Sequence, residues 1–373
     1  KFLESWKRLK YEDVIEVNSG KDYKHLEKGD IPVYGTGGYM LSVSEAITNK
    51  DGVGIGRKGT INKPYILKAP YWTVDTLFFC IPKNKYNLYF INAIFERTQW
   101  ERFDESTGVP SLSKLTINNI QNYFPSFDEQ SAIGSLFRTL DDLLASYKDN
   151  LANYQSLKAT MLSKMFPKAG QTVPEIRLDG FEGEWKLYEL KSRAETITKG
   201  TTPKDKSWQG EVNYIKTESI NRDTGSLVRT ASTSLDEHLG YLKRSILKED
   251  DVLFSIVGTL GVVGIVDKKD LPANTNQQIA IIRLKRDDAI FMLNFLKSPR
   301  IKSFIKSDST IGAQPSLSLW QIEKIKVSLP PSLEEQQAIG TYFSNLDNLI
   351  NSHQEKISQL ETLKKKLLQD MFI

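Results

Sequence analysis

The hexapeptide EQSAIG at residues 129–134 returns as EQQAIG at residues 335–340, and this pair decides the fold. The offset of 206 residues (129 to 335) holds without a gap as far as residues 166 and 372. Over these 38 paired positions 15 residues are identical. Chance does not produce such agreement, so the chain contains an internal repeat, which has to be recognised before any single motif is interpreted.

Both repeated segments have the pattern of long helices. A Ser-x-x-Glu capping box follows a proline at each start, from Ser126 to Glu129 and from Ser332 to Glu335, so we expect these side chains to satisfy amide hydrogens of the first turn. Behind the caps, apolar residues recur at spacings of three and four, which is typical of a coiled-coil seam. At about 1.5 Å per residue each helix spans roughly 57 Å. If a pseudo-two-fold axis relates the repeats, the helices pack antiparallel, through Leu140, Leu143, Tyr147, Leu151, Tyr154, Leu157, Leu346, Leu349, His353, Ile357, Leu360 and Leu363.

The repeat continues upstream more faintly, but the middle stretches, roughly residues 20–105 and 200–310, hardly align. Both contain short apolar runs punctuated by glycine, asparagine and lysine, a pattern that indicates strands. Each also contains one predicted helix, near Tyr89–Phe103 and Asp288–Lys306. The expected fold class is therefore α/β (α+β), with two β-rich domains and two long antiparallel helices. The expected segments are a first domain (1–124), a first long helix (125–167), a second domain (168–330) and a second long helix (331–373).

Composition is that of a globular protein, with 39% hydrophobic and 26% charged residues and a net charge of only +4. If the chain binds DNA, its basic residues must be grouped on one face, or a partner must share the phosphate contacts. The single cysteine, Cys80, lies in an apolar run and is expected to be buried in a strand. One cysteine excludes an internal disulfide and fits a cytoplasmic protein.

Several motifs together carry a family resemblance. In the second half they are Pro315-Ser316-Leu317-Ser318, Ile322, Leu329-Pro330-Pro331, and Glu335-Gln336 with Ala338-Ile339; ahead of them stand residues 173–178 (VPEIRL), Gly180-Phe181 and Trp185. The sequence resembles the specificity subunits of type I restriction–modification systems over nearly its whole length. The first repeat has no counterpart of residues 173–184, and residue 1 is not methionine, so we expect a short N-terminal piece to be missing.

The resemblance implies a DNA-binding role. Each domain would be a target recognition domain that reads one half of a split, asymmetric DNA sequence through the major groove, and the helices would set the unspecified gap. Two adenine-methylating modification subunits and an ATP-driven restriction/translocase subunit would be the protein partners. S-adenosylmethionine, ATP and Mg would belong to those partners, with no cofactor in this chain.

The sequence contains no recognisable catalytic constellation. The only Pro-Pro, Pro330-Pro331, is not followed by the aromatic residue that an adenine methyltransferase loop needs, and Thr60 stands where a phosphate-binding loop requires lysine. The histidines are more than a hundred residues apart and have no metal-ligand spacing, and His353 fits helix packing. We therefore expect no catalytic residue and no metal site.

Sequence-specific reading requires long polar side chains on protruding loops, with arginine or lysine suited to guanine and asparagine or glutamine to adenine. Hydroxyls and backbone amides suit phosphate. The candidate DNA-binding residues are Tyr34, Thr36, Tyr39, Arg57, Lys58, Thr60, Asn62 and Lys63 in the first domain, and Lys199, Thr201, Thr202, Lys204, Lys216, Thr217, Asn221, Asn274, Asn276, Gln277, Gln314 and Ser316 in the second. The segments 107–111 and 312–316 are the candidate phosphate contacts.

Two other interpretations stay open. Each candidate loop could be a solvated β-turn without a ligand. The whole chain could be a non-enzymatic repeat scaffold that binds proteins through its helices and does not read DNA, because the helices fit either function equally well.

Overall fold

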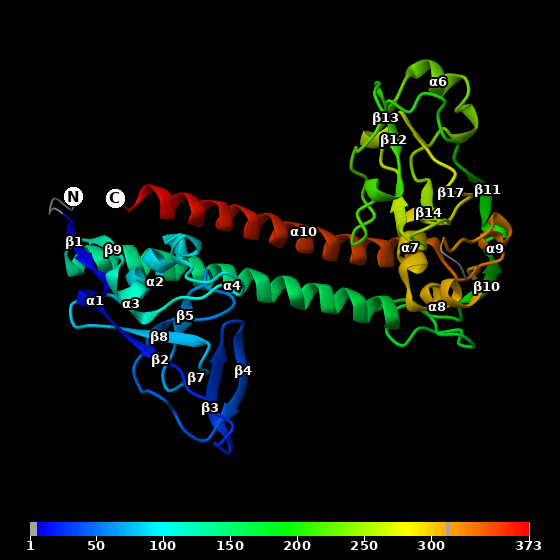
Figure 1. Cartoon of the computed structure of the whole chain (residues 1–373). Coiled ribbons are helices and arrows are strands. Elements are labelled where there is room, and N and C mark those ends of the chain that lie inside the picture. The colour runs from blue at the N-terminus through cyan, green and yellow to red at the C-terminus, as the bar shows by residue number, and fades with distance from the viewer. Residues whose placement is uncertain (1–5, 311–313, 373) are drawn as a thin grey trace. The chain divides into compact units, whose positions relative to one another are not determined.

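Both predicted long helices are present in the computed structural model, which describes residues 6–310 and 314–372 (Figure 1). Helix α4 spans Phe127–Lys164 and helix α10 spans Leu333–Asp370, with 38 residues each. The chain divides into two units: unit 1 is Lys1–Asp149 with Glu355–Ile373, and unit 2 is Asn150–Gln354. Each unit therefore contains part of both helices, whereas the sequence suggested that the helices form segments of their own.

The helices run antiparallel. In unit 1, Lys364 of α10 pairs with Asp141 of α4 at 2.5 Å, and in unit 2 Lys158 of α4 pairs with Asp347 of α10. The first pair joins the early part of α4 to the late part of α10, and the second pair joins the late part of α4 to the early part of α10. The offset of 206 converts one pair into the other (141 to 347, 158 to 364), as a pseudo-two-fold relation requires.

The prediction of a leucine seam is only partly right. Leu143, Leu157, Leu349 and Leu363 are between 36% and 44% exposed, so their assignment to a buried interface is corrected. The buried face runs through Leu140 and Leu144 on α4, and through Leu346 and Ile350 on α10. A heptad pattern assumes that a helix packs only on its partner helix, but here each helix also covers the core of a β-rich unit, which turns its buried face. The other predicted positions are half-buried: Tyr147, Leu151, Tyr154, His353, Ile357 and Leu360.

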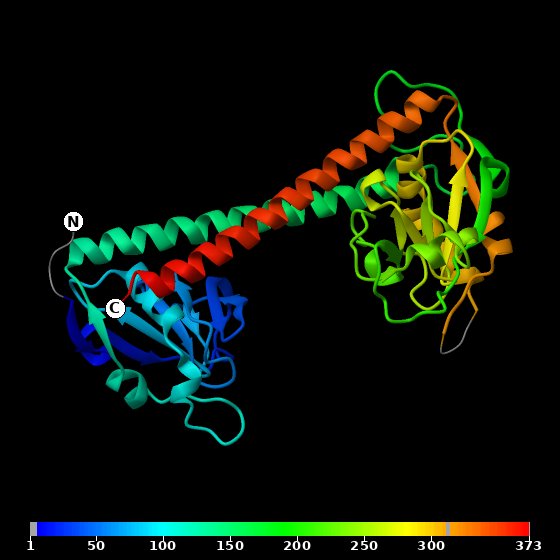
Figure 2. The ribbon, with the colours of Figure 1, turned by 90° about the horizontal axis from the view of Figure 1, so that it is seen from above.

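Each long helix is followed by a phenylalanine that lies in the aromatic core of a unit. Phe372, after α10, packs in unit 1 against Phe90 at 5.5 Å and Phe137 at 5.9 Å between ring centroids. In both views the red end of α10 lies beside the α2 region of that unit (Figures 1 and 2). Its repeat counterpart Phe166, after α4, packs in unit 2 against Phe291 at 5.5 Å and Phe343 at 6.0 Å. Burying such a ring contributes about 1.5–3 kcal/mol, which explains why Met-Phe ends both repeats.

Only the serine half of each predicted capping box is present. Ser126 accepts from the Glu129 amide at 3.4 Å, and Ser332 from the Glu335 amide at 3.2 Å. The glutamates do not complete the boxes, because each carboxylate instead accepts from a tryptophan indole at 3.3 Å: Glu129 from Trp6 and Glu335 from Trp185. The first residue of the repeated hexapeptide thus ties the long helix to the segment that enters each unit.

The glutamine and glycine of the hexapeptide hold a second helix. In unit 1, Gln130 accepts from the Asn87 amide at 3.1 Å, and Asn87 caps helix α2 (Leu88–Arg97). In unit 2, Gln336 accepts from the Asp288 amide at 3.0 Å, and Asp288 caps helix α7 (Ala289–Lys297). A Cβ at Gly134 would lie 2.4 Å from the Asn87 Oδ1 atom. Glycine is therefore required at this position for the two helices to touch.

Unit 1 is built from one four-stranded, one three-stranded and one two-stranded sheet. Their strand orders are β2-β8-β5-β6, β4-β3-β7 and β1-β9. Among the described residues of unit 1, all neighbouring strands are antiparallel except β3 and β7. The remaining elements of unit 1 are β1 Lys7–Lys10, α1 Tyr11–Val14, β2 Ile15–Ser19, β3 Lys28–Gly35, β4 Gly38–Val43, β5 Gly52–Gly56, β6 Tyr65–Leu67, β7 Trp72–Thr73, β8 Leu77–Pro82, the 3-10 helix η1 Trp100–Phe103, α3 Lys114–Asn119 and β9 Gln121–Phe124.

Unit 2 repeats this topology although its sequence hardly aligns with unit 1. Its strand orders are β11-β17-β14-β15, β13-β12-β16 and β10-β18, and in the part of the unit that the structure describes only β12 and β16 are parallel. The elements are β10 Lys186–Glu189, α5 Leu190–Arg193, β11 Ala194–Lys199, β12 Val212–Ile215, η2 Thr217–Ser219, β13 Ser232–Thr233, α6 Leu235–Leu239, η3 Lys243–Ser245, β14 Val252–Ser255, β15 Val263–Ile265, η4 Lys268–Asp270, β16 Ala273–Thr275, β17 Ile279–Leu284, α8 Pro299–Asp308, α9 Leu319–Glu323 and β18 Lys326–Leu329. The fold is thus one topology used twice.

The structure also tests the two shorter predicted helices and the predicted burial of Cys80. The helices predicted near Tyr89–Phe103 and Asp288–Lys306 are each divided in two: α2 with η1, and α7 with α8. The second break falls at Ser298, which is extended ahead of Pro299 because the residue before a proline disfavours helical geometry. Cys80 is buried in β8, as predicted. Among the described residues, no helix is both long and apolar enough to cross a membrane.

Candidate nucleic-acid interface

In unit 1 the candidate loops meet at one end of the four-stranded sheet. Neighbouring antiparallel strands alternate in direction, so the end of β2, the start of β8 and the end of β5 lie at the same edge. The Gly20 amide donates to the Leu77 carbonyl at 3.1 Å, and the Arg57 amide donates to the Thr76 carbonyl at 2.8 Å. We call this edge, with its counterpart in unit 2, the loop edge.

The Arg57 loop follows β5 and is held by the Pro-Ser-Leu segment. The Gly59 amide donates to the Pro110 carbonyl at 2.8 Å, and the Leu112 amide donates to the Arg57 carbonyl at 2.9 Å. Gly59 has a φ of +96°, a left-handed conformation that favours glycine. The backbone of the loop is thus fixed while the side chains of Arg57, Lys58 and Thr60 are exposed.

Unit 2 builds the same loop from residues that the sequence analysis missed. The Gly258 amide donates to the Pro315 carbonyl at 2.9 Å, and the Leu317 amide donates to the Ile256 carbonyl at 2.9 Å. Gly258 and Thr259 therefore correspond to Gly59 and Thr60. The signal was present in the sequence as a Gly-Thr pair in both halves, but only its pairing with the Pro-Ser-Leu segment makes the correspondence evident.

Two candidate segments of unit 2 come together at its loop edge. The Thr201 amide donates to the Thr275 carbonyl at 2.8 Å, and the hydroxyl of Thr202 bonds to the Gln277 amide oxygen. In unit 1 the equivalent bond joins the Lys21 amide to the Thr73 carbonyl at 2.8 Å. Lys21 is exposed and is a second residue that sequence reasoning missed.

One asparagine predicted to bind DNA is buried, and two others stabilise the turns in which they lie. Asn274 is fully buried in β16, where its side chain bonds to His238 at 2.6 Å and to the Leu242 carbonyl at 3.1 Å, so it cannot reach DNA. Asn221 accepts the amides of residues 223 and 224 through its side-chain oxygen, and Asn276 accepts the amide of residue 278. Asparagine in these turns supports the backbone locally, a use that a sequence reader cannot separate from base reading.

The tyrosine loop of unit 1 is the hairpin between β3 and β4. Gly35 pairs with Gly38 across a tight turn that contains Thr36, as expected for a turn. Tyr34 packs against Tyr39 at 6.4 Å between ring centroids, and its carbonyl accepts from the Val74 amide at 3.0 Å. The hairpin is thus tied to the loop edge, and Tyr39 is 62% exposed.

The remaining candidates lie on the surface of their units with fewer constraints. Lys216 lies over the Trp208 ring at 3.5 Å and Lys204 over the Tyr241 ring at 4.8 Å, so their ammonium groups are already engaged in cation–π contacts. Thr217 is half-buried. Exposed or half-buried positions complete the set: Asn62, Lys63, Lys199, Gln314 and Ser316. Residues 312 and 313 of the predicted phosphate segment lie outside the described residues.

These groups suit recognition rather than bond-breaking chemistry. The loop edges present guanidinium, ammonium, hydroxyl and amide groups, which donate hydrogen bonds to phosphates and base edges. Across residues 6–310 and 314–372, no cluster of three or more His, Cys, Asp or Glu side chains could hold a metal ion. His353 packs on Tyr154 at 5.1 Å, in agreement with the packing role predicted for it.

Comparison with known proteins gives one consistent family. Residues 4–153 and 182–362 match the type I restriction modification DNA specificity domain. The chain is 24% identical over 275 residues to the specificity subunit of the type I restriction enzyme MjaVIII of Methanocaldococcus jannaschii, covering 71% of this chain and 64% of that protein. It is 23% identical over 428 residues to the specificity subunit of the Escherichia coli type I enzyme EcoBI, covering 99% of this chain and 86% of that protein. This chain thus spans less than two thirds of the archaeal relative.

Solved structures share the fold. The S subunit of a type I restriction–modification system from M. genitalium aligns over 100% of this chain and 97% of its own, with a TM-score of 0.70 and 16% sequence identity. A chain of another type I restriction–modification system aligns over 99% of this chain and 98% of its own, with a TM-score of 0.54 and 15% identity.

Proposed function

The chain belongs to the family of type I restriction modification DNA specificity domains, and on this premise we propose that it reads one bipartite, asymmetric DNA sequence. Each unit binds one half of the target. One observation carries the proposal: the two units have the same topology and the same loop edge, but the side chains on those edges differ. A conserved frame with different side chains on its loops suits two readers of different half-sites.

The roles of the loop residues follow from their chemistry. Arg57 and Lys58 are exposed on a fixed backbone and suit guanine in the major groove, whereas Gln277 suits adenine. Thr60 and Thr259, next to glycines, suit phosphate contacts that position the unit without reading sequence. With a net charge of only +4, the chain needs these grouped cations, and partner subunits, to hold DNA.

The proposal includes the partners that methylate and cleave DNA. Modification subunits contribute S-adenosylmethionine chemistry, and restriction/translocase subunits contribute ATP and Mg. The complex acts in the cytoplasm, where the DNA is. The long helices contribute the fixed gap between half-sites, because residues 129–164 of α4 and 335–370 of α10 fall within the part of the chain that the repeat preserves best.

A selection experiment tests the proposal. The full chain, alone and with its modification subunits, is incubated with a library of random duplexes, and bound DNA is sequenced. We expect enrichment of two short motifs at a constant separation, strongest with the partners present. Arg57→Ala should lose preference in one motif only. Lys85→Ala should change neither motif, because Lys85 is exposed beyond the end of β8 that lies opposite the loop edge. Equal representation of all sequences in both conditions would favour the protein-binding scaffold instead.

A further inference from the structure

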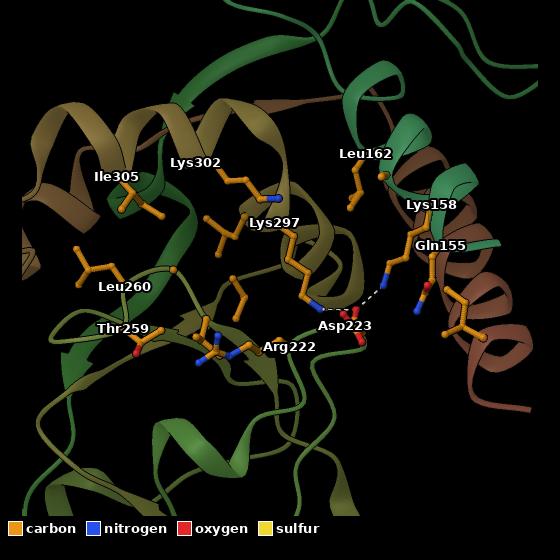
Figure 3. A pocket seen from close by; sticks show the side chains of 16 residues that line it. Gln155, Lys158, Leu162, Arg222, Asp223, Thr259, Leu260, Lys297, Lys302 and Ile305 are labelled. Atoms are coloured by element: carbon orange, nitrogen blue, oxygen red, sulfur yellow. Dashed lines mark hydrogen bonds between the residues drawn. The ribbon is translucent and has the colours of Figure 1, made fainter. Parts of the chain in front are cut away.

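Unit 2 contains a hollow of about 680 Å³ between the end of α4, helices α7 and α8, and the loop after β14 (Figure 3). This volume lies within the roughly 300–1,000 Å³ of typical small-ligand sites. Four cationic side chains line it, against the single carboxylate of Asp223: Lys158, Arg222, Lys297 and Lys302. The rest of the wall includes Leu162, Leu260 and Ile305, so the hollow combines a cationic side with an apolar one.

Two of the ammonium groups converge on one neutral oxygen. Lys158 and Lys297 both donate to the carbonyl oxygen of Asp223, Lys297 at 3.0 Å (Figure 3). Lys158 is also paired with Asp347, but within the described part of the chain no ion pair joins Lys297 to a carboxylate. Burial first, and then the charge of Lys158, lower the pKa of Lys297 to about 7. Below about pH 7, where Lys297 is charged, the four cations of the wall outnumber the carboxylates of Asp223 and Asp347 that attract Lys297.

In unit 1, the position equivalent to the two lysines of the hollow contains a carboxylate. Helices α2 and α7 begin at the equivalent caps Asn87 and Asp288, so Glu96 stands where unit 2 has Lys297. The Glu96 carboxylate pairs at 2.6 Å with Lys364, the repeat counterpart of Lys158. Burial opposes the charge of Lys364, but its carboxylate neighbours outweigh burial and raise its pKa. Unit 1 thus supplies an internal carboxylate at the position where unit 2 has a further cation.

We propose that the hollow of unit 2 binds a small organic phosphate of nucleotide size. Its phosphoryl group lies between Lys158 and Lys297 and supplies the negative charge that Glu96 supplies in unit 1. Lysine ammonium groups bind phosphate as compact point charges. The apolar wall of Leu162, Leu260 and Ile305 receives the organic part. Thr259 belongs to both the hollow and the loop edge, so a phosphate of bound DNA is the other source of the same chemistry.

Titration calorimetry of the full chain with adenosine monophosphate and with sulfate, at constant ionic strength and about pH 6.5, tests the site. We expect saturable binding of both probes to the wild type. Lys297→Gln should weaken it by about tenfold or more, the effect of losing one charge-assisted hydrogen bond. Lys297→Glu should abolish it, because the new carboxylate pairs with Lys158 as Glu96 does with Lys364. Lys268→Glu makes the same charge change at an exposed position outside the hollow and should leave binding unchanged.

The same titration at about pH 8.5 gives an independent readout. Sulfate keeps its charge there, whereas Lys297 of the free protein loses its proton, so sulfate affinity should fall in the wild type and stay level in Lys297→Gln. The proposal is wrong if neither probe binds saturably, or if folded Lys297→Glu binds them as the wild type does. A last arm repeats the adenosine monophosphate titration with the protein saturated by its DNA target. Unchanged affinity supports a free organic phosphate, and complete loss assigns the hollow to a DNA phosphate and overturns the small ligand.

Discussion

Replacing Lys158 with methionine removes the cation at the centre of unit 2. The Lys158 and Asp347 side chains are only 8% and 12% exposed, so the substitution leaves a carboxylate buried without its partner. Removal of one member of a buried pair costs about 3–5 kcal/mol of unfolding free energy. We expect the lower end, about 3 kcal/mol, because Asp347 also attracts the nearby Lys297, which is relieved of the like charge of Lys158.

The repeat supplies a matched comparison. Lys364→Met removes the counterpart cation in unit 1, where the Asp141 and Glu96 side chains are 39% and 21% exposed. Water compensates more of the loss there, so we expect a smaller cost, about 1.5–3 kcal/mol, as for a hydrogen bond to a charged group.

Calorimetric unfolding of the full chain, with hydrogen exchange resolved by segment, measures both effects. Exchange should rise mainly in unit 2 for Lys158→Met and mainly in unit 1 for Lys364→Met. The double variant Lys158→Met/Asp347→Leu should recover most of the lost stability, since an apolar replacement of a buried pair is close to neutral. A Lys158→Met variant as stable as the wild type, or a double variant no more stable than the single one, would show that the Lys158–Asp347 pair does not stabilise unit 2 in this way.

Three further predictions address recognition and charge. Arg57→Ala should cost about 1–3 kcal/mol of discrimination in one half-site, and wild-type affinity of this variant for both matched and mismatched duplexes would refute a base contact. Lys199→Ala, if Lys199 contacts phosphate, should weaken binding to all sequences alike and flatten the salt dependence of binding. Four residues inserted after Ser146 lengthen α4 by about 6 Å and rotate the remainder of the helix by only about 40° from a whole turn. The preferred gap between half-sites in methylated duplexes should therefore grow by about two base pairs. An unchanged gap in a folded variant would exclude the helices as the spacer. The pKa of Lys297 is about 7 in the native state, below its ordinary value of 10.5, so the native state binds fewer protons than the unfolded state between pH 7 and 10.5. The unfolding free energy of the wild type, measured relative to Lys297→Gln, should therefore rise with pH from about 7 to 10.5 and stay level below pH 7.

The long helices and the twofold repeat were predictable because they leave a periodic signal in the sequence. What periodicity could not give was the direction of the buried face. Leu143 fits a heptad as well as Leu144 does, but in the structure Leu144 lies near Lys364 and Leu368 of α10 and is 8% exposed, whereas Leu143 is 42% exposed. In the same way Glu129 fits a capping box, but an indole 123 residues away along the chain takes its carboxylate.

The residue types of the candidate interface could be predicted from the sequence, but the position and exposure of each side chain could not. Arg57 and Lys199 were found because arginine, lysine and glycine cluster there, and the structure leaves both side chains exposed. Asn274 has equally suitable chemistry, but it lies in β16, where burial forces it to satisfy its hydrogen bonds internally. Thr259 was missed because its loop has no charge of its own, and its position becomes apparent only through the pairing of Gly258 with Pro315.

The exchange of one reader tests the central claim most directly. Residues 15–110 are replaced by the equivalent stretch of a relative, so that Trp6 and the β1–β9 pair stay with the helices to which they belong. The variant is expressed with its modification subunits, and methylated sites are mapped across the genome. We expect one half of the methylated motif to change while the other half and the gap between them stay the same. A motif that changes in both halves, or in neither, would contradict a chain in which each unit reads its own half-site.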